Sequence, residues 1–176
     1  MSTEIEKKEV RAGAETDAQT SARSSNPVEG QYAPGMDLSS VNYTSLNPFY
    51  PDSYGQCVWY AWGRTREAMI TNIIFSATSG RNGGRWYDLV TNAKRKTSTP
   101  AVGDRGVIVW DHDYGGHVAF MEKYDGTYVW FSDSNGRIEN QVDTVQKKTL
   151  AATKNYCNGL PNGRFVGFLI FNDYAS

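Results

Sequence analysis

The sequence has few of the residues that build disulfide frameworks or metal sites. It contains two cysteines, Cys57 and Cys157, and two histidines among 176 residues. It has no Cys-x-x-Cys or His-x-x-x-His spacing and no Asp-x-Asp-x-Asp loop of the kind that binds calcium. Two cysteines do not make a disulfide scaffold, although a single bridge between them is an alternative. We therefore expect free thiols, no metal and no other cofactor.

Long apolar runs and a charge excess are also missing. No segment approaches the roughly 18 consecutive apolar residues of a membrane span, and residues 1–10 lack the apolar stretch of a secretory signal peptide. The net charge is −1, from 18 basic and 19 acidic residues. This balance gives no electrostatic reason to expect nucleic acid or an anionic membrane as a partner.

Composition divides the chain into a tail and a domain. Residues 1–40 are rich in small and polar residues and poor in large apolar ones, so they bury too little surface to offset the entropy of ordering them. We interpret them as a flexible polar tail. Residues 41–176 hold nearly all of the aromatic residues, which make up 13% of the chain, and are long enough for one domain.

The stretch from Tyr54 to Arg64 places a cysteine near a predicted helix start. Ser53 and Gln56 match the Ser-x-x-Gln capping box, which predicts a helix from Tyr54 to about Thr71 with Cys57 in its first turn. The N–H groups and the dipole at a helix start favour thiolate over thiol. This position suits a nucleophilic cysteine, whereas a structural one would not need it.

The second half of the chain has the pattern of strands. Apolar, β-branched runs bounded by Gly and Asp-Gly signals predict strands at 106–110, 117–124, 127–135 and 163–171. A shorter second helix is predicted from Trp86 to Ala93, and 140–158 has an irregular, polar pattern. Helices first and an antiparallel meander second indicate an α+β domain, with N-terminal helices packed on an antiparallel β-sheet.

A thiol nucleophile needs a base, and the base needs an orienting partner. His117 opens a predicted strand after two glycines, whereas His112 lies in a loop between two aspartates and is expected to be solvated. The hairpin that turns at Asp125-Gly126 brings the end of the next strand back toward His117. A strict two-residue turn would pair His117 with Ser134, while one extra residue would bring Asp133 or Asn135 opposite it.

These segments resemble the CHAP family, the cysteine- and histidine-dependent amidohydrolases and peptidases of bacterial cell-wall metabolism. Gly55–Arg64 resembles the family's cysteine segment, and Gly116–Phe120 resembles its histidine segment. Asn92-Ala93 and Pro100–Asp104 resemble its intervening landmarks, and Ser132–Asn135 the segment of its remaining polar residues. The resemblance implies a papain-like fold. The family commonly has Glu where this chain has Asp133, which leaves Asp133 and Asn135 both open as the partner of His117.

The resemblance implies amide hydrolysis through a thioester. The Cys57 thiolate, paired with the His117 imidazolium, would attack an amide carbonyl, and the backbone N–H of Cys57 would stabilise the oxyanion if the helix starts later than the capping box indicates. Gln56 is a second candidate donor, although the capping box gives it a structural role. Candidates for the wall of the cleft are Tyr54, Trp59 and Trp130, for which core packing is an equally good expectation.

The resemblance also implies peptidoglycan as the substrate. Expected activities are N-acetylmuramoyl-L-alanine amidase or endopeptidase on the peptide stem or cross-bridge, as in endolysins and other bacteriolytic enzymes. Without a signal peptide, the protein would reach the wall by lysis, on a virion or by non-Sec export. The alternatives are a non-catalytic wall-binding or adaptor module on the same fold and a cysteine amidase with a different amide substrate.

Overall fold

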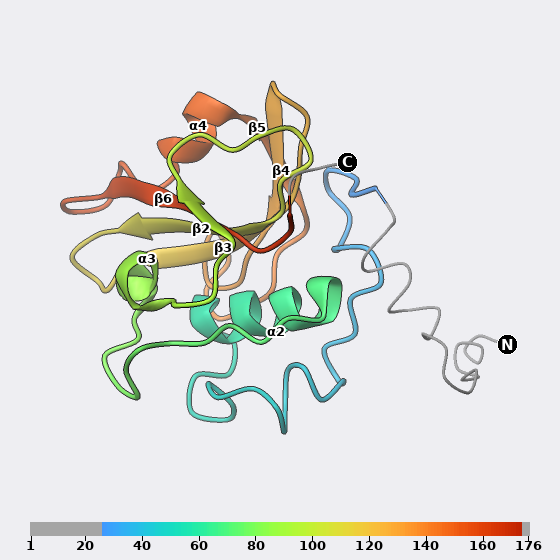
Figure 1. The fold of residues 1–176 in the computed structure, drawn as a ribbon, viewed down its shortest axis with the longest axis vertical. Coiled ribbons are helices and arrows are strands. Elements are labelled where there is room, and N and C mark those ends of the chain that lie inside the picture. The colour runs from blue at the N-terminus through green and yellow to red at the C-terminus, as the bar shows by residue number, and fades with distance from the viewer. Residues whose placement is uncertain (1–25, 174–176) are drawn as a thin grey trace, which may run out of the picture.

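The computed structural model describes residues 26–173, which form an α+β domain (Figure 1). In the described part, one antiparallel sheet has the strand order β1-β6-β2-β3-β4-β5. The elements are α2 (Cys57–Met69), η1 (Gly83–Arg85), α3 (Trp86–Leu89), β1 (Arg95–Thr97), β2 (Gly106–Asp111), β3 (His117–Tyr124), β4 (Tyr128–Ser132), β5 (Gln146–Thr149), α4 (Leu150–Lys154) and β6 (Arg164–Ile170). The α+β class and the antiparallel sheet are confirmed.

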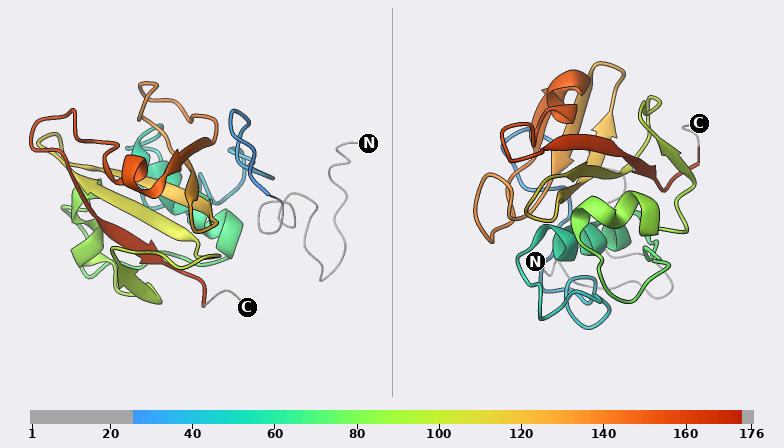
Figure 2. Two further views of the ribbon diagram at one scale, coloured as in Figure 1. Left: turned by 90° about the horizontal axis from the view of Figure 1, so that it is seen from above. Right: turned by 90° about the vertical axis from the view of Figure 1, so that its left-hand side faces the viewer.

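Hydrophobic layers cover both faces of the sheet, with α2 on one side and α4 on the other (Figure 2). Successive residues of β2 alternate between the layers, because side chains along a strand point to opposite faces. Val107 and Val109 pack with the aromatic residues of α2, while Ile108 and Trp110 pack with Phe131 and the α4 side. Burial on both faces explains why this strand is a continuous apolar run.

The β3–β4 hairpin has one extra residue in β3. Tyr124 pairs with Val129, but the register shifts between Met121 and Lys123, so Glu122 has no partner of its own. Beyond the shift, Phe120 pairs with Ser132, which places the chain after β4 beside the start of β3. The predicted proximity of His117 to residues 133–135 therefore exists in the structure, and it depends on this bulge.

Two short edge strands and one helix were missed by the sequence reading. β5 and α4 lie within 140–158, which was predicted to be irregular. The sequence of β5 is Gln-Lys-Lys-Thr, which lacks the apolar pattern of a strand. In the structure the ammonium group of Lys147 lies over the rings of Tyr128 and Trp130, at 4.4 and 5.1 Å from their centroids. The predicted helix from Trp86 to Ala93 ends early at Leu89, because Val90 forms a β-bridge with Phe75.

Part of the predicted tail packs on the domain. Gly30 N–H donates to Val145 O at 2.9 Å, and Val145 N–H donates to Gln31 O at 2.7 Å. Ala33 is buried, and Asp37 N–H donates to Glu67 Oε2 at 2.8 Å. Residues 26–40 therefore contact the domain, in contrast to the predicted boundary at residue 40, whereas residues 1–25 lie outside the described part of the chain.

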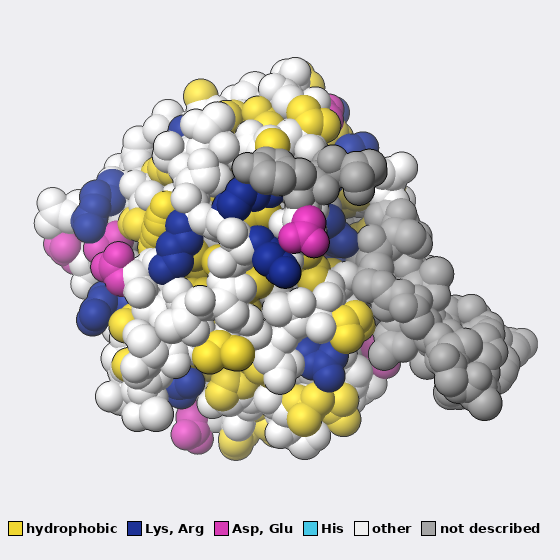
Figure 3. Space-filling model, in the orientation of Figure 1, with side chains coloured by type: hydrophobic (Ala, Val, Ile, Leu, Met, Phe, Trp, Pro, Cys, Tyr) yellow, Lys and Arg dark blue, Asp and Glu magenta, His cyan; other side chains and the backbone are white. Residues whose placement is uncertain are grey.

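Charged side chains of both signs are distributed over the surface. On the face drawn in Figure 3, Lys and Arg side chains form separate patches interrupted by neutral, hydrophobic and acidic ones. None of the helices within 26–173 has the length and apolar character needed to cross a bilayer.

A buried ion-pair network ties α2 to the β3 bulge. Arg64 is fully buried, and its Nε and Nη2 donate to the two carboxylate oxygens of Glu122 at 2.8 Å each. Arg64 Nη1 also donates to Glu67 Oε1 at 3.0 Å. Burial acts to raise the pKa of Glu122, but the charge and hydrogen bonds of Arg64, together with the charge of Arg105 and the Ser132 hydrogen bond, outweigh it, and the pKa is lowered. The network therefore fixes the bulged residue to the helix that carries Cys57.

Glu122→Ala is expected to lower the free energy of unfolding by about 3–5 kcal/mol, because it leaves the buried Arg64 charge without its main partner. Urea unfolding of both proteins measures the difference. Asp173→Ala is the matched control, since the ion pair of Asp173 with Lys94 is exposed and should contribute less than about 1 kcal/mol. Equal effects of the two substitutions would contradict the prediction.

Candidate active site

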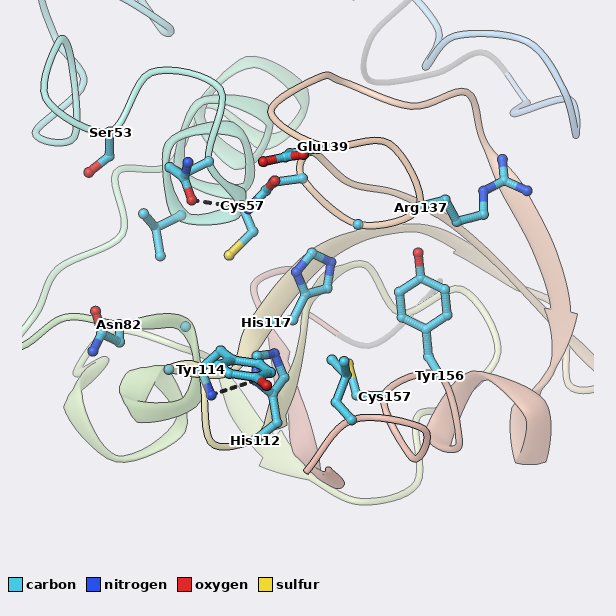
Figure 4. Close-up of a pocket in the computed structure, with 18 residues that line it drawn as sticks. Ser53, Cys57, Asn82, His112, Tyr114, His117, Arg137, Glu139, Tyr156 and Cys157 are labelled. Atoms are coloured by element: carbon cyan, nitrogen blue, oxygen red, sulfur yellow. Dashed lines mark hydrogen bonds between the residues drawn. The ribbon is translucent and has the colours of Figure 1, made fainter. Parts of the chain in front are cut away.

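The candidate site is a cavity of about 810 Å³ where the start of α2, the start of β3 and the loops after β4 and α4 meet. Figure 4 shows Cys57, His117, Tyr156 and Cys157 around this space. The residues that line it include Gln56, Cys57, Asn82, His112, His117, Asn135, Arg137, Glu139, Tyr156 and Cys157.

The helix start places Cys57 differently from the capping-box prediction, which is wrong. The N-cap of α2 is Gln56, with extended backbone angles and no side-chain cap, so Cys57 is the first helical residue. Gly55 has a φ of +89°, a backbone conformation that cannot be part of a helix, so the helix cannot begin at Tyr54. The chain instead makes a turn here, in which Gln56 N–H donates to Ser53 O at 2.9 Å. The N–H of Cys57 consequently has no acceptor within the helix.

His117 lies between Cys57 and Asp133. Its Nε2 is 2.8 Å from Asp133 Oδ2, and both side chains are buried. A carboxylate only accepts hydrogen bonds, so Nε2 carries the hydrogen and Nδ1 is left to face the cysteine. The sulfur of Cys57 points toward the imidazole ring (Figure 4), and Cys57 is one of the groups that raise the pKa of His117.

The surroundings of His117 favour its protonated form. Burial alone would lower its pKa, but the charge of Cys57, the hydrogen bonds to Asp133 and Cys57, and the charge of Asp133 raise the pKa to about 10. The ring therefore remains an imidazolium through neutral pH, between the Cys57 sulfur and the Asp133 carboxyl group. This arrangement can pair a thiolate with a proton donor.

His112 lacks these partners. Burial and the charge of His117 lower its pKa, despite the opposite effect of Asp111 and Asp113. Its Nδ1 accepts a hydrogen bond from Tyr114 N–H at 3.0 Å. His112 lines the cavity at a distance from the Cys57–His117 pair, in the hairpin loop where the sequence placed it (Figure 4).

Comparison with known families gives a match that spans the cysteine and histidine segments. The model of the CHAP domain matches residues 47–135, which is half of the chain and includes Cys57, His117 and Asp133. The chain belongs to the CHAP family. CHAP domains are in general amidases or peptidases that act on peptidoglycan, so membership indicates hydrolase activity of this kind. Neither the curated proteins nor the solved structures gave a match.

Asn135 of the CHAP domain contacts Gln56 and not His117. Its Nδ2 donates to Gln56 Oε1 at 3.1 Å, and Gln56 Nε2 donates to Asn140 Oδ1 at 2.6 Å. Asn140 N–H donates in turn to Asn135 Oδ1 at 2.7 Å. This closed set of amides holds the side chain of Gln56 at the cavity, beside Cys57. Of the two residues left open by the sequence, Asp133 is the one that contacts the imidazole.

The predicted cleft aromatics lie elsewhere. Tyr54 is exposed and Trp59 is buried, and both line a smaller groove next to the cavity. Trp59 also packs in the core, with its Nε1 donating to Tyr43 O at 2.8 Å. Trp130 projects from the sheet, where Lys123 and Lys147 lie over its ring at 4.9 and 5.1 Å. The cavity lining includes none of the three, so the expectation that they form its wall is not met.

Several cavity residues were not found from the sequence. Arg137, Glu139, Tyr156 and Cys157 all line the cavity, and all follow the matched segment. Their stretch has no repeated pattern. Arg137 and Glu139 lie on the loop after β4, and Tyr156 and Cys157 reach the site after the chain returns through β5 and α4. Both cysteines are free, and no cluster of three or more His, Cys, Asp or Glu side chains suited to a metal occurs within 26–173.

Proposed function

We propose that the protein is a cysteine-dependent peptidoglycan hydrolase. It cleaves an amide bond, as an N-acetylmuramoyl-L-alanine amidase or as an endopeptidase of the stem or cross-bridge. One observation carries the proposal: Cys57, the first residue of α2, faces His117, whose other ring nitrogen contacts the buried Asp133. A binding module needs none of these three groups, whereas acyl transfer uses each of them.

The proposed reaction passes through a thioester. The Cys57 thiolate attacks the amide carbon, and the carbonyl oxygen takes up negative charge facing the Cys57 N–H, with the Gln56 amide as a second donor. The C–N bond then breaks as His117 gives its proton to the departing amine. His117 next takes a proton from water, which attacks the thioester, releases the carboxylic acid and restores the thiolate.

The cavity suits a peptide that carries both charge signs. Arg137 and Glu139 line it on the loop after β4, and Arg137 also pairs with Asp143 at 2.7 Å. Peptidoglycan stems present carboxylates and amines, which these side chains complement. We further propose a papain-like arrangement of helix and sheet. We also propose action at the bacterial wall after lysis, on a virion or through non-Sec export.

Analysis of digested wall tests the proposal. An amidase frees the lactyl carboxyl group of muramic acid and the amine of L-alanine, whereas an endopeptidase frees an amine within the stem or cross-bridge. Labelling of new amines followed by mass spectrometry of the fragments distinguishes these products. A new amine of one kind, absent from wall treated with Cys57→Ala, is the expected result. If the digest contains no new amine, the proposed activity is refuted.

A further inference from the structure

Tyr156 contacts the carboxylate that orients His117. Its Oη lies 3.0 Å from Asp133 Oδ2, the same oxygen that His117 Nε2 approaches to 2.8 Å. The other oxygen, Oδ1, is buried and has no hydrogen-bond partner among residues 26–173. Both side-chain bonds of this buried carboxylate therefore converge on Oδ2, one from the imidazole and one from the tyrosine.

Gln146 fixes the direction of the Tyr156 hydroxyl. Gln146 Nε2 lies 2.9 Å from Tyr156 Oη and can only donate to it. The single hydrogen of the hydroxyl is then free to point at Asp133 Oδ2. Burial and the charge of Asp133 raise the pKa of Tyr156, so the phenol keeps its hydrogen at neutral pH.

The backbone packs closely around this contact. A Cβ added at Gly136 would meet Asp133 Oδ2 at 2.4 Å and Tyr156 Oη at 2.9 Å. The Tyr156 ring is also held by Trp110 and Phe131, at 5.1 Å between centroids in each case. The hydroxyl is therefore placed by the fold, and its contact with Asp133 does not depend on a mobile surface side chain.

We propose that Tyr156 is a positioning residue of the active site: its hydroxyl, oriented by Gln146, holds Asp133 against His117. The line of contacts runs from Cys57 through His117 and Asp133 to Tyr156 and Gln146, and its last two members lie outside the segment that defines the CHAP match. Only the predicted effects on kcat rest on the proposed hydrolase function; the predicted effect on the pKa of His117 does not.

Without the Tyr156 hydroxyl, His117 is the one side chain left that hydrogen-bonds the Asp133 carboxylate among the described residues. Asp133 then rotates more freely, and both its hydrogen bond and its charge act less on the imidazolium. Since these two effects help to raise the pKa of His117, that pKa should fall. Proton transfer to the leaving amine then becomes less well aligned, which affects kcat, whereas the retained aromatic ring leaves substrate binding unchanged.

Tyr156→Phe tests the inference, with Tyr43→Phe as a matched control. Tyr43 is also buried and donates to a carboxylate, Glu67 Oε1, at 2.6 Å, but it does not contact His117 or Asp133. On a soluble stem-peptide substrate, Tyr156→Phe should lower kcat about tenfold with KM nearly unchanged. Gln146→Met removes the group that orients the hydroxyl and should lower kcat about threefold. Tyr43→Phe should leave kcat unchanged.

NMR titration provides a readout that is independent of activity. The chain has two histidines, so His112 serves as the internal reference for His117. In Tyr156→Phe the midpoint of His117 should fall by about one pH unit, which corresponds to about 1.4 kcal/mol, while that of His112 stays in place. A His117 midpoint and kcat equal to those of Tyr43→Phe would overturn the positioning role. A fallen midpoint in a protein that cuts no wall would instead support it and refute the hydrolase function.

Discussion

Cys57→Ala is expected to slow the clearing of purified cell wall by at least about 10⁴-fold, because it removes the group that forms the thioester. Cys157→Ala is the matched control, since Cys157 is also a free, buried cysteine that lines the same cavity. Its loss should change the rate by less than about tenfold. Zymography and turbidity assays on purified wall measure both variants at equal protein concentration.

The two cysteines differ in what surrounds the sulfur. Burial, followed by the charges of Asp133 and Cys57, raises the pKa of Cys157 to about 12, so it stays a thiol at neutral pH. Cys57 instead begins α2 and faces the His117 imidazolium. Cys157 therefore cannot replace Cys57 as nucleophile. Clearing by wild type and Cys57→Ala alike, or by neither protein, would refute the catalytic assignment.

Local sequence signals predicted the elements that a short segment determines by itself. The strand from His117 to Tyr124 has the predicted bounds, because its apolar run and the Asp125-Gly126 turn are local signals. The predicted helix start was wrong because local spacing did not decide it. The spacing of Ser53 and Gln56 fits a capping box, but Gly55 takes a positive φ and Gln56 bonds Asn140, which lies 84 positions away.

The sequence predicted the site residues that lie in motifs, but not those that only tertiary contacts bring to the site. Cys57 and His117 each lie in a recognisable segment. The choice of Asp133 or Asn135 over Ser134 depended on the extra residue at Glu122, which pairs with the buried Arg64. The choice between Asp133 and Asn135 depended on side-chain contacts, since Asn135 bonds Gln56 while Asp133 bonds His117. Tyr156 reaches Asp133 only because the chain beyond β4 returns to the site through β5 and α4. Such long-range contacts leave no periodic signal in the sequence.

The reactivity of the two thiols provides a second large effect. At about pH 6, iodoacetamide is expected to modify Cys57 at least about 10³ times faster than Cys157. Both sulfurs line one cavity, and the two residues are 9% and 4% exposed, so access differs little. The thiolate fraction then decides the rates, because the thiolate and not the thiol attacks the reagent. Mass spectrometry of peptides from the labelled protein measures each rate.

The pH dependence of labelling distinguishes an effect of thiolate formation from an effect of reagent access to the two sulfurs. The imidazolium of His117 persists until the pH approaches its pKa of about 10, so its charge beside the Cys57 sulfur stays the same from about pH 6 to 9. Cys157 lies far below its pKa of about 12 in this range, so its rate should rise about tenfold per pH unit. The selectivity for Cys57 therefore decreases as the pH rises and disappears in denaturant. Equal rates in the folded protein at about pH 6 would show that His117 does not hold Cys57 as a thiolate, and acyl transfer from this cavity would lose its nucleophile.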